Sequence, residues 1–213
     1  MKYSTVIVAA GKGTRTNLGY NKLFYEMHGE MMIAKTASVF VNDPDCEEII
    51  MVISLDDRQM FERILSSDKI TYTKGGSTRQ ESVFKGLEIV KSDYVMIHDG
   101  ARPYIDKKEL TKLKRTLQED DACLLAVPVV DTIKIVKDGY VEYSPERSTC
   151  YSAQTPQCFK TDLIIECHKR AAADGFVASD DAQLVETYGG NIRVKLVPGD
   201  YANKKITTKE DLI

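Results

Sequence analysis

The chain has 213 residues, of which 43% are hydrophobic and 29% are charged, and its formal net charge at pH 7 is -3. This length and balance predict a single soluble α/β domain, 1–213, with a sizeable core. The slightly negative charge argues against nucleic acid as a partner. Because no apolar run is long enough to span a bilayer, we expect no membrane segment.

The five cysteines are odd in number and include no Cys-x-x-Cys pair. This usage argues against a disulfide framework and against a zinc site, and it favours a reducing compartment. The N-terminal residues lead straight into an apolar strand and lack the long apolar core of a signal peptide. We therefore expect a cytoplasmic protein.

The first distinctive motif is a glycine-rich turn that directly follows an apolar segment. Thr5–Ala10 has the composition of a buried strand, and Gly11-Lys12-Gly13-Thr14-Arg15 follows it at once. Glycines at such a point let the backbone turn sharply, and outward-facing amides beside Lys12, Arg15 and Lys22 would bind a polyphosphate. The turn is neither a dinucleotide fingerprint, which needs glycine where Thr16 stands, nor a Walker loop. The alternative is an ordinary strand-to-helix turn with solvated lysines.

Strand-like and helix-like segments alternate as far as residue 130. This alternation predicts a Rossmann-like, mostly parallel sheet with helices on both faces. Capping-box spacing marks the starts of two of the helices, at Thr78 and at Asp106. After the first strand we expect further strands at Glu48–Ser54, Ile70–Thr73, Asp93–His98 and Ala122–Val130. Helices are expected at Met31–Val41, Asp56–Leu65 and Thr78–Val90, and from Asp106 onward.

The pattern then changes to a β-hairpin. Thr132–Val136 and Tyr140–Tyr143 alternate apolar and polar residues around Lys137-Asp138-Gly139, and Asp-Gly is typical of a tight hairpin turn. Several apolar side chains of this hairpin have no evident partner in a doubly wound domain. Either a projecting arm, about 131–150, packs on a second subunit, or the hairpin lies at the edge of the parent sheet.

The last part of the chain returns to alternating elements. Thr155-Pro156-Gln157 is expected to interrupt the chain. Two helices are predicted, at Asp162–Ala173 and from Ser179 to Tyr188. Strands are predicted at Ile192–Val197 and Lys204–Thr207, and a final helix is expected to begin at Thr208.

Charged residues gather just past the carboxyl ends of the predicted strands, which is where open α/β sheets bind ligands. They are Lys12, Arg15 and Lys22 after the first strand, Arg79 after the third, and Asp99 and Arg102 after the fourth. A single member could be a structural ion pair, but several together favour an anionic ligand.

The sequence offers cations but no recognisable nucleophile. It contains no Gly-x-Ser-x-Gly motif and only three histidines, of which His98 is expected to be structural. This combination fits group transfer at phosphorus from a nucleotide, since an attacking phosphate is already ionised and needs no general base. Positioned Lys and Arg, with Mg²⁺ on the phosphates, would lower the barrier between the two anions. Asp99 is the carboxylate expected to face the metal.

Nine blocks cover essentially the whole chain and resemble the 2-C-methyl-D-erythritol 4-phosphate cytidylyltransferase family. In chain order they are AAGKGTR, NKLF, GGSTRQESVFKGL, HDGARP, AVPVVDTIK, PERS, TPQCF, SDDAQLVE and NKKITTKEDL. The resemblance implies an enzyme of the non-mevalonate isoprenoid pathway. Such an enzyme joins the phosphate of methylerythritol phosphate to the α-phosphorus of CTP and releases pyrophosphate.

The resemblance also implies roles for individual residues. Arg15 and Lys22 would hold the phosphates and stabilise charge at the α-phosphorus, and the catalytic set is Arg15, Lys22 and Lys205. CTP would be bound by Ala9, Ala10, Gly11, Gly13, Gly75, Gly76, Ser82 and Asp99, with Asp99 also near Mg²⁺. Methylerythritol phosphate would be bound by Arg102, Thr132, Arg147 and Thr155. Since Thr132 and Arg147 lie on the arm, the resemblance implies a homodimer that exchanges arms.

The chain departs from many members of the family at Asn21-Lys22-Leu23, where they have Pro-Lys-Gln, and at Gly100, where alanine is common. Three rival functions remain open. They are a ribitol-5-phosphate (pentitol-phosphate) cytidylyltransferase, a sugar-1-phosphate nucleotidyltransferase that uses another base, and a nucleotide-binding regulator without catalysis.

Overall fold

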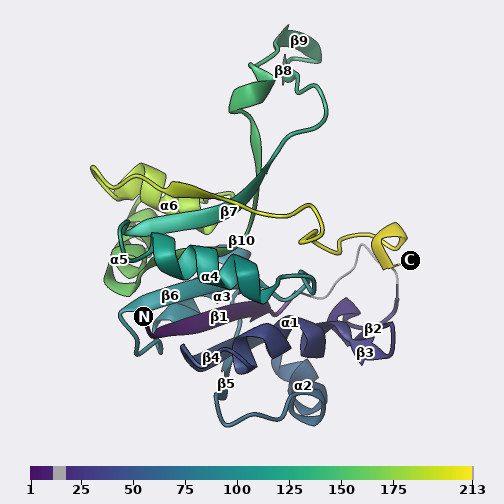
Figure 1. Ribbon diagram of the computed structural model, residues 1–213. Helices are drawn as coiled ribbons and strands as arrows, with labels where there is room; N and C mark the ends of the chain where they lie inside the picture. Colours follow the sequence, from purple (N-terminus) through teal and green to yellow (C-terminus); the bar gives the residue numbers. More distant parts are fainter. Residues whose placement is uncertain (12–17, 213) are drawn as a thin grey trace.

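The structure, a computed structural model, describes residues 1–11 and 18–212. Its centre is a seven-stranded sheet with the strand order β11-β7-β10-β6-β1-β4-β5 (Figure 1). All neighbouring strands pair in parallel except β10, which runs antiparallel to both β6 and β7. The predicted mostly parallel sheet is therefore confirmed. The strands are β1 (Tyr3–Ala9), β4 (Cys46–Ile53), β5 (Ile70–Lys74), β6 (Tyr94–Asp99), β7 (Ala122–Pro128), β10 (Tyr151–Lys160) and β11 (Lys195–Pro198).

Helices cover both faces of this sheet, as predicted. Side chains alternate along each strand, so Ile7 and Ala9 of β1 join one buried cluster and Val6 joins the other. The first cluster is closed by α1 (Met32–Val41), α2 (Arg58–Ile64) and α4 (Lys107–Thr116). The second is closed by α3 (Arg79–Leu87), α5 (Thr161–Asp174) and α6 (Asp181–Tyr188).

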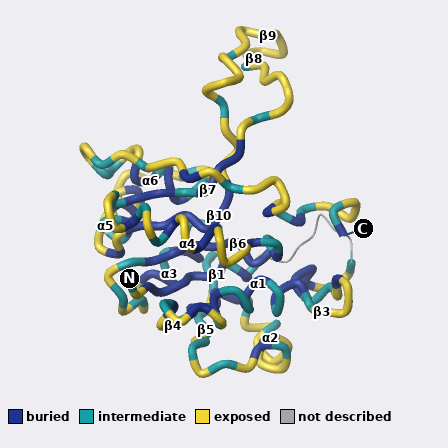
Figure 2. The backbone as a smooth tube through the Cα atoms, in the orientation of Figure 1, coloured by how far each residue is buried: buried dark blue, intermediate teal, exposed yellow. Residues whose placement is uncertain are grey.

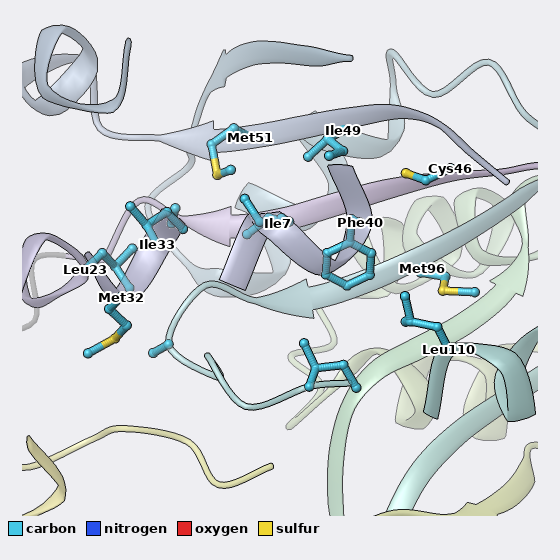
Figure 3. Close-up of a cluster of buried hydrophobic side chains, with 14 of the residues drawn as sticks. Ile7, Leu23, Met32, Ile33, Phe40, Cys46, Ile49, Met51, Met96 and Leu110 are labelled. Carbon is cyan, nitrogen blue, oxygen red and sulfur yellow. The ribbon is translucent and has the colours of Figure 1, made fainter. Parts of the chain in front are cut away.

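The first cluster shows how the sheet holds its helices. In Figure 3, Phe40 of α1 lies in one cluster with Ile7 of β1 and with Met51 and Ile49 of β4. Ile7, Ile49, Met51 and Phe40 are all 0% exposed. Burying side chains of this kind contributes about 1.5–3 kcal/mol each relative to leaving them in water, which fixes the strand ends that carry the polar residues.

The two predicted capping boxes form to different extents. At α4 the Asp106 side chain accepts from the Glu109 amide, and the Glu109 carboxylate accepts from the Asp106 amide. At α3 the Thr78 hydroxyl accepts from the Glu81 amide, but the Glu81 carboxylate turns to the amide and hydroxyl of Ser77. Both helices start where the spacing predicts.

The expectation that Thr155-Pro156-Gln157 interrupts the chain was wrong, because these residues lie inside β10. Proline cannot donate to a strand ladder, so it normally argues against a central strand. Here the pairing of β10 with β7 shifts register between Ala153 and Gln157, and the irregularity accommodates Pro156. The antiparallel strand fills the place between β6 and β7.

The hairpin forms as predicted, but the alternative that it lies at the edge of the parent sheet was wrong. β8 (Ile135–Lys137) and β9 (Tyr140–Tyr143) make a two-stranded sheet of their own. Asp138 and Gly139 have φ of 50° and 84°, the left-handed conformation that this turn requires. Figure 2 shows the hairpin projecting from the body and mostly exposed, and Tyr140 is 80% exposed.

The predicted strand at Lys204–Thr207 does not form, and this segment is irregular. Its main-chain groups contact side chains and loops instead of a neighbouring strand: the Ile206 amide donates to the Ala101 carbonyl, 2.8 Å away. The remaining short elements are β2 (Glu26–Met27), β3 (Glu30–Met31) and 3-10 turns at Lys22–Phe24, Leu55–Asp57, Arg147–Thr149 and Glu210–Leu212.

Candidate active site

A cavity of about 440 Å³ opens at the carboxyl ends of β1 and β6, next to the start of α3. This is the edge where the sequence predicted a ligand. The predicted site residues that line this cavity are Ala9, Ala10, Gly11, Lys22, Gly76, Ser82, Asp99 and Lys205. Gly13 and Arg15 lie outside the described residues, so their predicted roles remain predictions.

Lys22 enters the cavity from a short 3-10 turn. Asn21 caps this turn by accepting from the Leu23 amide, and its own amide donates to Asp57 at 2.9 Å. Leu23 is 3% exposed and anchors the turn in the core. The Nζ of Lys22 donates to the Ile206 carbonyl at 2.6 Å, which ties the first cation of the site to the C-terminal segment. The departure from Pro-Lys-Gln is therefore accommodated by a capping asparagine and a buried leucine.

Two glycines let the backbone pass close to the cavity wall. Gly75 does not line the cavity, but a Cβ at this position would lie 2.4 Å from the Cβ of Ala10. A Cβ at Gly76 would meet the Glu81 side chain at 2.4 Å. The Ser82 hydroxyl accepts from the Gly76 amide at 3.0 Å. Glycine is thus required here for close approach, and the wall it makes is backbone and small side chains.

A second cavity of about 260 Å³ adjoins the first. Two more predicted residues, Arg102 and Thr155, line it. Arg79, Asp99 and Lys205 line both cavities and so stand at their junction. The site therefore consists of two compartments that meet at two cations and one carboxylate.

Asp99 is surrounded by positive charge at this junction. Its carboxylate lies 3.2 Å from Nε of Arg79, 2.8 Å from Nζ of Lys205 and 3.8 Å from Nε of Arg102. Burial opposes ionisation of Asp99, but attraction to Arg79, then to Lys205 and Arg102, outweighs it and holds the pKa of Asp99 well below its ordinary value. The carboxylate is ionised at neutral pH and arranges three cations around the second cavity.

The interaction between Arg79 and Asp181 was missed by sequence reasoning. The Nη2 of Arg79 donates to the Asp181 carboxylate at 2.8 Å, and the Asp181 side chain is 1% exposed. The sequence pattern places Arg79 among the cations at this edge and Asp181 only at a helix start. The signal was present in the Asp180-Asp181 pair, because Asp180 alone caps α6 through the Gln183 amide and leaves Asp181 without a capping role.

His98 is structural, as expected, and is 0% exposed. The Thr155 hydroxyl accepts from the Asp99 amide at 3.0 Å and lies 3.0 Å from Nδ1 of His98, while Nε2 of His98 lies 3.2 Å from the Arg102 carbonyl. Since a carbonyl can only accept, Nε2 carries the ring proton and donates to the Arg102 carbonyl, and the unprotonated Nδ1 accepts from the Thr155 hydroxyl. The neutral ring thus holds the loop that carries Asp99 and Arg102.

This arrangement predicts a loss of stability in mild acid. Burial lowers the pKa of His98 to about 4, whereas an unfolded histidine titrates near ~6.5. A depressed pKa stabilises the fold fully above the unfolded pKa, and this stability disappears as pH falls toward the folded value. Between pH 7.5 and pH 5, His98 alone should lower the free energy of unfolding by about 2 kcal/mol.

Urea unfolding at several pH values measures the change in stability, and NMR of the histidine ring measures its pKa. His98→Gln is the control, because it removes the contribution of His98 and should make the profile shallower. The remaining slope comes from His168, since burial and then Arg79 also lower the pKa of His168 to about 4. A His98 ring that takes up its proton near pH 6.5 in the folded protein would contradict the account.

The two predicted arm residues stand apart from the cavities within one chain. Thr132 and Arg147 are exposed, and neither lines either cavity. The Arg147 guanidinium contacts only the base of its own arm, through the Val130 carbonyl at 3.4 Å, among the interactions described. Within one chain neither residue reaches a described cavity, so their contact with substrate stays a prediction.

Chemically, the site suits transfer between two anionic groups. Lys22 and Lys205 both line a cavity with a backbone wall, and Arg79 and Arg102 add positive charge at the second cavity. Such an array stabilises charge that develops on phosphoryl oxygens. No serine, cysteine or histidine is placed as an activated nucleophile among the residues described, since His98 is engaged inward.

Comparison with known proteins agrees with this geometry. The family model for 2-C-methyl-D-erythritol 4-phosphate cytidylyltransferase (IspD) matches residues 3–213. The chain belongs to this family. Proteins of that name from Bacillus licheniformis and Clostridioides difficile are 42% and 41% identical to it. The alignments cover 100% and 99% of this chain, and 94% and 90% of those proteins.

Solved structures of the family share the fold. The crystal structure of 4-diphosphocytidyl-2C-methyl-D-erythritol synthase from Anaerococcus prevotii superposes with a TM-score of 0.90 at 35% identity, covering 99% of this chain and 94% of that one. The family enzyme from Thermus thermophilus gives a TM-score of 0.81 at 30% identity, covering 100% and 96%. The resemblance in the nine sequence blocks is confirmed.

None of the helices described is long and apolar enough to cross a membrane.

Proposed function

We propose that the protein transfers the cytidylyl group of CTP to 2-C-methyl-D-erythritol 4-phosphate. An oxygen of the acceptor phosphate attacks the α-phosphorus of CTP in line with the leaving group, a bond to the α-phosphorus forms, and the bond to the β-phosphate bridge breaks. The products are CDP-methylerythritol and pyrophosphate. Membership of this family assigns the reaction to isoprenoid biosynthesis.

The observation that carries this proposal is the pair of cavities joined at Arg79, Asp99 and Lys205. CTP occupies the larger cavity, where the small side chains and the Gly75–Gly76 backbone suit a flat base. Lys22, with Arg15, holds the triphosphate. The acceptor phosphate occupies the second cavity beside Arg102, Thr155 and Lys205, which brings it to the α-phosphorus at the junction.

Mg²⁺ bound to the CTP phosphates fits the residues present. In such sites Mg²⁺ takes one or two carboxylates and completes its shell with phosphate oxygens and water. Among the described residues Asp99 is the carboxylate that lines the nucleotide cavity, so it would supply the protein ligand. Because three cations already surround Asp99, we assign it no more than one contact with the metal. When bound, Mg²⁺ would neutralise part of the triphosphate charge.

We further propose that the active unit is a homodimer that exchanges arms. Each chain is one nucleotidyltransferase domain, 1–213, whose arm spans about 131–150. The exposed apolar side chains of the arm support this, since Val136, Val141 and Tyr143 are 58%, 60% and 55% exposed in the single chain. Burial on a partner would bring Thr132 and Arg147 to the partner's second cavity.

All five cysteines are free, which supports a cytoplasmic location.

The proposed activity is tested by pyrophosphate release with defined donors and acceptors. CTP with methylerythritol phosphate and Mg²⁺ should give rapid release, whereas UTP, GTP or ribitol 5-phosphate should give little. Omitting Mg²⁺ should suppress the reaction. Faster release with ribitol 5-phosphate than with methylerythritol phosphate would instead establish the pentitol-phosphate enzyme.

A further inference from the structure

The segment from Gly199 to Thr207 has no regular secondary structure, yet it carries two groups of the active site. Lys205 extends from it to Asp99, and the Ile206 carbonyl accepts from Lys22 at 2.6 Å. Without a strand ladder, the position of these groups must come from contacts made by individual side chains and amides. We call this segment, 199–207, the strap.

Asn203 makes a fully buried contact of this kind. Its side chain is 0% exposed, and its amide nitrogen donates to the Thr155 carbonyl at 3.0 Å. Its own carbonyl accepts from the Arg102 guanidinium at 2.7 Å. Asn203 lines neither cavity, although it connects the strap to two residues that line the second one.

The position of Asn203 decides which part of the strap it can fix. It precedes Lys205 by two residues, and the next anchor beyond Lys205 is the Ile206 amide on the Ala101 carbonyl. Lys205 is thus held between a side-chain anchor on β10 and a main-chain anchor on the loop after β6. Because the Oδ1 of Asn203 finds no partner among the described residues, its side chain acts through the single donor bond to Thr155.

We infer that Asn203 is a positioning residue that sets Lys205 at the junction of the two cavities. Lys205 reaches its ion pair with Asp99 at 2.8 Å although its side chain is 37% exposed, so the charge alone does not hold it there. Removing the Asn203 donor leaves the bonds from Gln154 to the Asp200 carbonyl and from Arg102 to the Asn203 carbonyl in place. It removes the side-chain anchor on β10 that lies nearest Lys205, and this lets Lys205 leave the junction. The kinetic part of this inference rests on the proposed function, whereas the placement of Lys205 does not.

The placement is tested by chemical labelling of lysines in the intact protein. Wild type and Asn203→Ala are treated with an amine acylating reagent, and peptides are quantified by mass spectrometry. Lys205 should be labelled severalfold faster in the variant. Lys204 is the matched control, because it is adjacent, is 51% exposed and lies 3.9 Å from Asp211, and its rate should not change. Equal labelling of Lys205 in the two folded proteins would overturn the inference, whether or not the protein has the proposed activity.

A double-mutant cycle tests the link to turnover. Asn203→Ala should lower kcat/KM for methylerythritol phosphate on the order of tenfold in the wild-type background, but by less than about threefold in a Lys205→Ala background. A purely structural defect would cost the same factor in both backgrounds, and that result would overturn the positioning role. If Asn203→Ala does not fold, the same cycle is made with Asn203→Leu, which keeps the side-chain volume but has no donor.

Tyr201→Phe is the control for the strap as a whole. It removes another strap anchor, the bond from the Tyr201 hydroxyl to the Pro128 carbonyl at 2.7 Å, at a residue that is 56% exposed. This variant should keep kcat/KM within about twofold of wild type, since an exposed hydrogen bond contributes little. A loss as large as that of Asn203→Ala would contradict a specific role for Asn203.

Discussion

Replacing Lys22 by alanine should lower kcat on the order of a hundredfold or more, with a smaller effect on the KM for CTP. The size is that of removing one preorganised donor from a site where negative charge develops. Lys22 is 9% exposed and lines the nucleotide cavity, so water cannot readily take over its interaction with the phosphates. Steady-state pyrophosphate release, with CTP varied at saturating methylerythritol phosphate, separates kcat from KM.

A control variant and a stability measurement separate a loss of catalysis from a general loss of charge or of folding. Lys204→Ala removes a nearby cation that lines neither cavity, and it should leave both constants within about twofold of wild type. A thermal melt of Lys22→Ala shows whether loss of its bond to the Ile206 carbonyl loosens the fold. Near-normal kcat with only a raised KM would mean that Lys22 binds CTP equally in the ground and transition states.

The second prediction with a large effect on activity concerns active sites that two chains share. Lys22→Ala and Arg147→Ala homodimers should each be nearly inactive, because every site would lack one cation. Co-expression of the two mutant chains should restore roughly a quarter of wild-type activity. With random pairing half of the dimers are mixed, and in each mixed dimer one site collects both defects while the other collects none.

The exposed position of Arg147 is what makes this prediction sharp. In a single chain it lines neither cavity of its own body. If Arg147 nevertheless served its own chain, every site in a mixed dimer would keep one defect, and co-expression would recover nothing. The assay requires differently tagged chains, so that the mixed dimer can be purified and its activity measured separately.

Much of the fold could be predicted because local patterns and tertiary structure agree. The β1 and β4 segments are apolar on both faces, and the capping spacing at Asp106 produces a complete capping box. Prediction failed where tertiary contacts override local preference. Pro156 lies in a central strand because a register shift accommodates it, and 204–207 resembles a strand but has no neighbouring strand to pair with.

The part of the site that could be predicted is the set of charged residues that follow the strand ends. Lys22, Asp99 and Lys205 meet at the first cavity although they lie far apart in the sequence. Sequence reasoning missed the supporting contacts, because the bond from Arg79 to Asp181 and the anchor from Asn203 to Thr155 depend on which loops the sheet order brings together. For Arg79 and Asp181 the local sequence offers only a second aspartate beside the cap of α6, and for Asn203 and Thr155 it offers no signal. The contact of the arm with a second chain stays a prediction, because it lies outside the contacts of one chain.

The central claim is that the acceptor phosphate attacks the α-phosphorus of CTP. It is tested most directly with methylerythritol phosphate that carries oxygen-18 in the terminal oxygens of its phosphate, followed by mass spectrometry of both products. The account predicts that all of the label appears in CDP-methylerythritol and none in pyrophosphate. Label in pyrophosphate, or formation of CMP in place of the cytidylyl product, would contradict it.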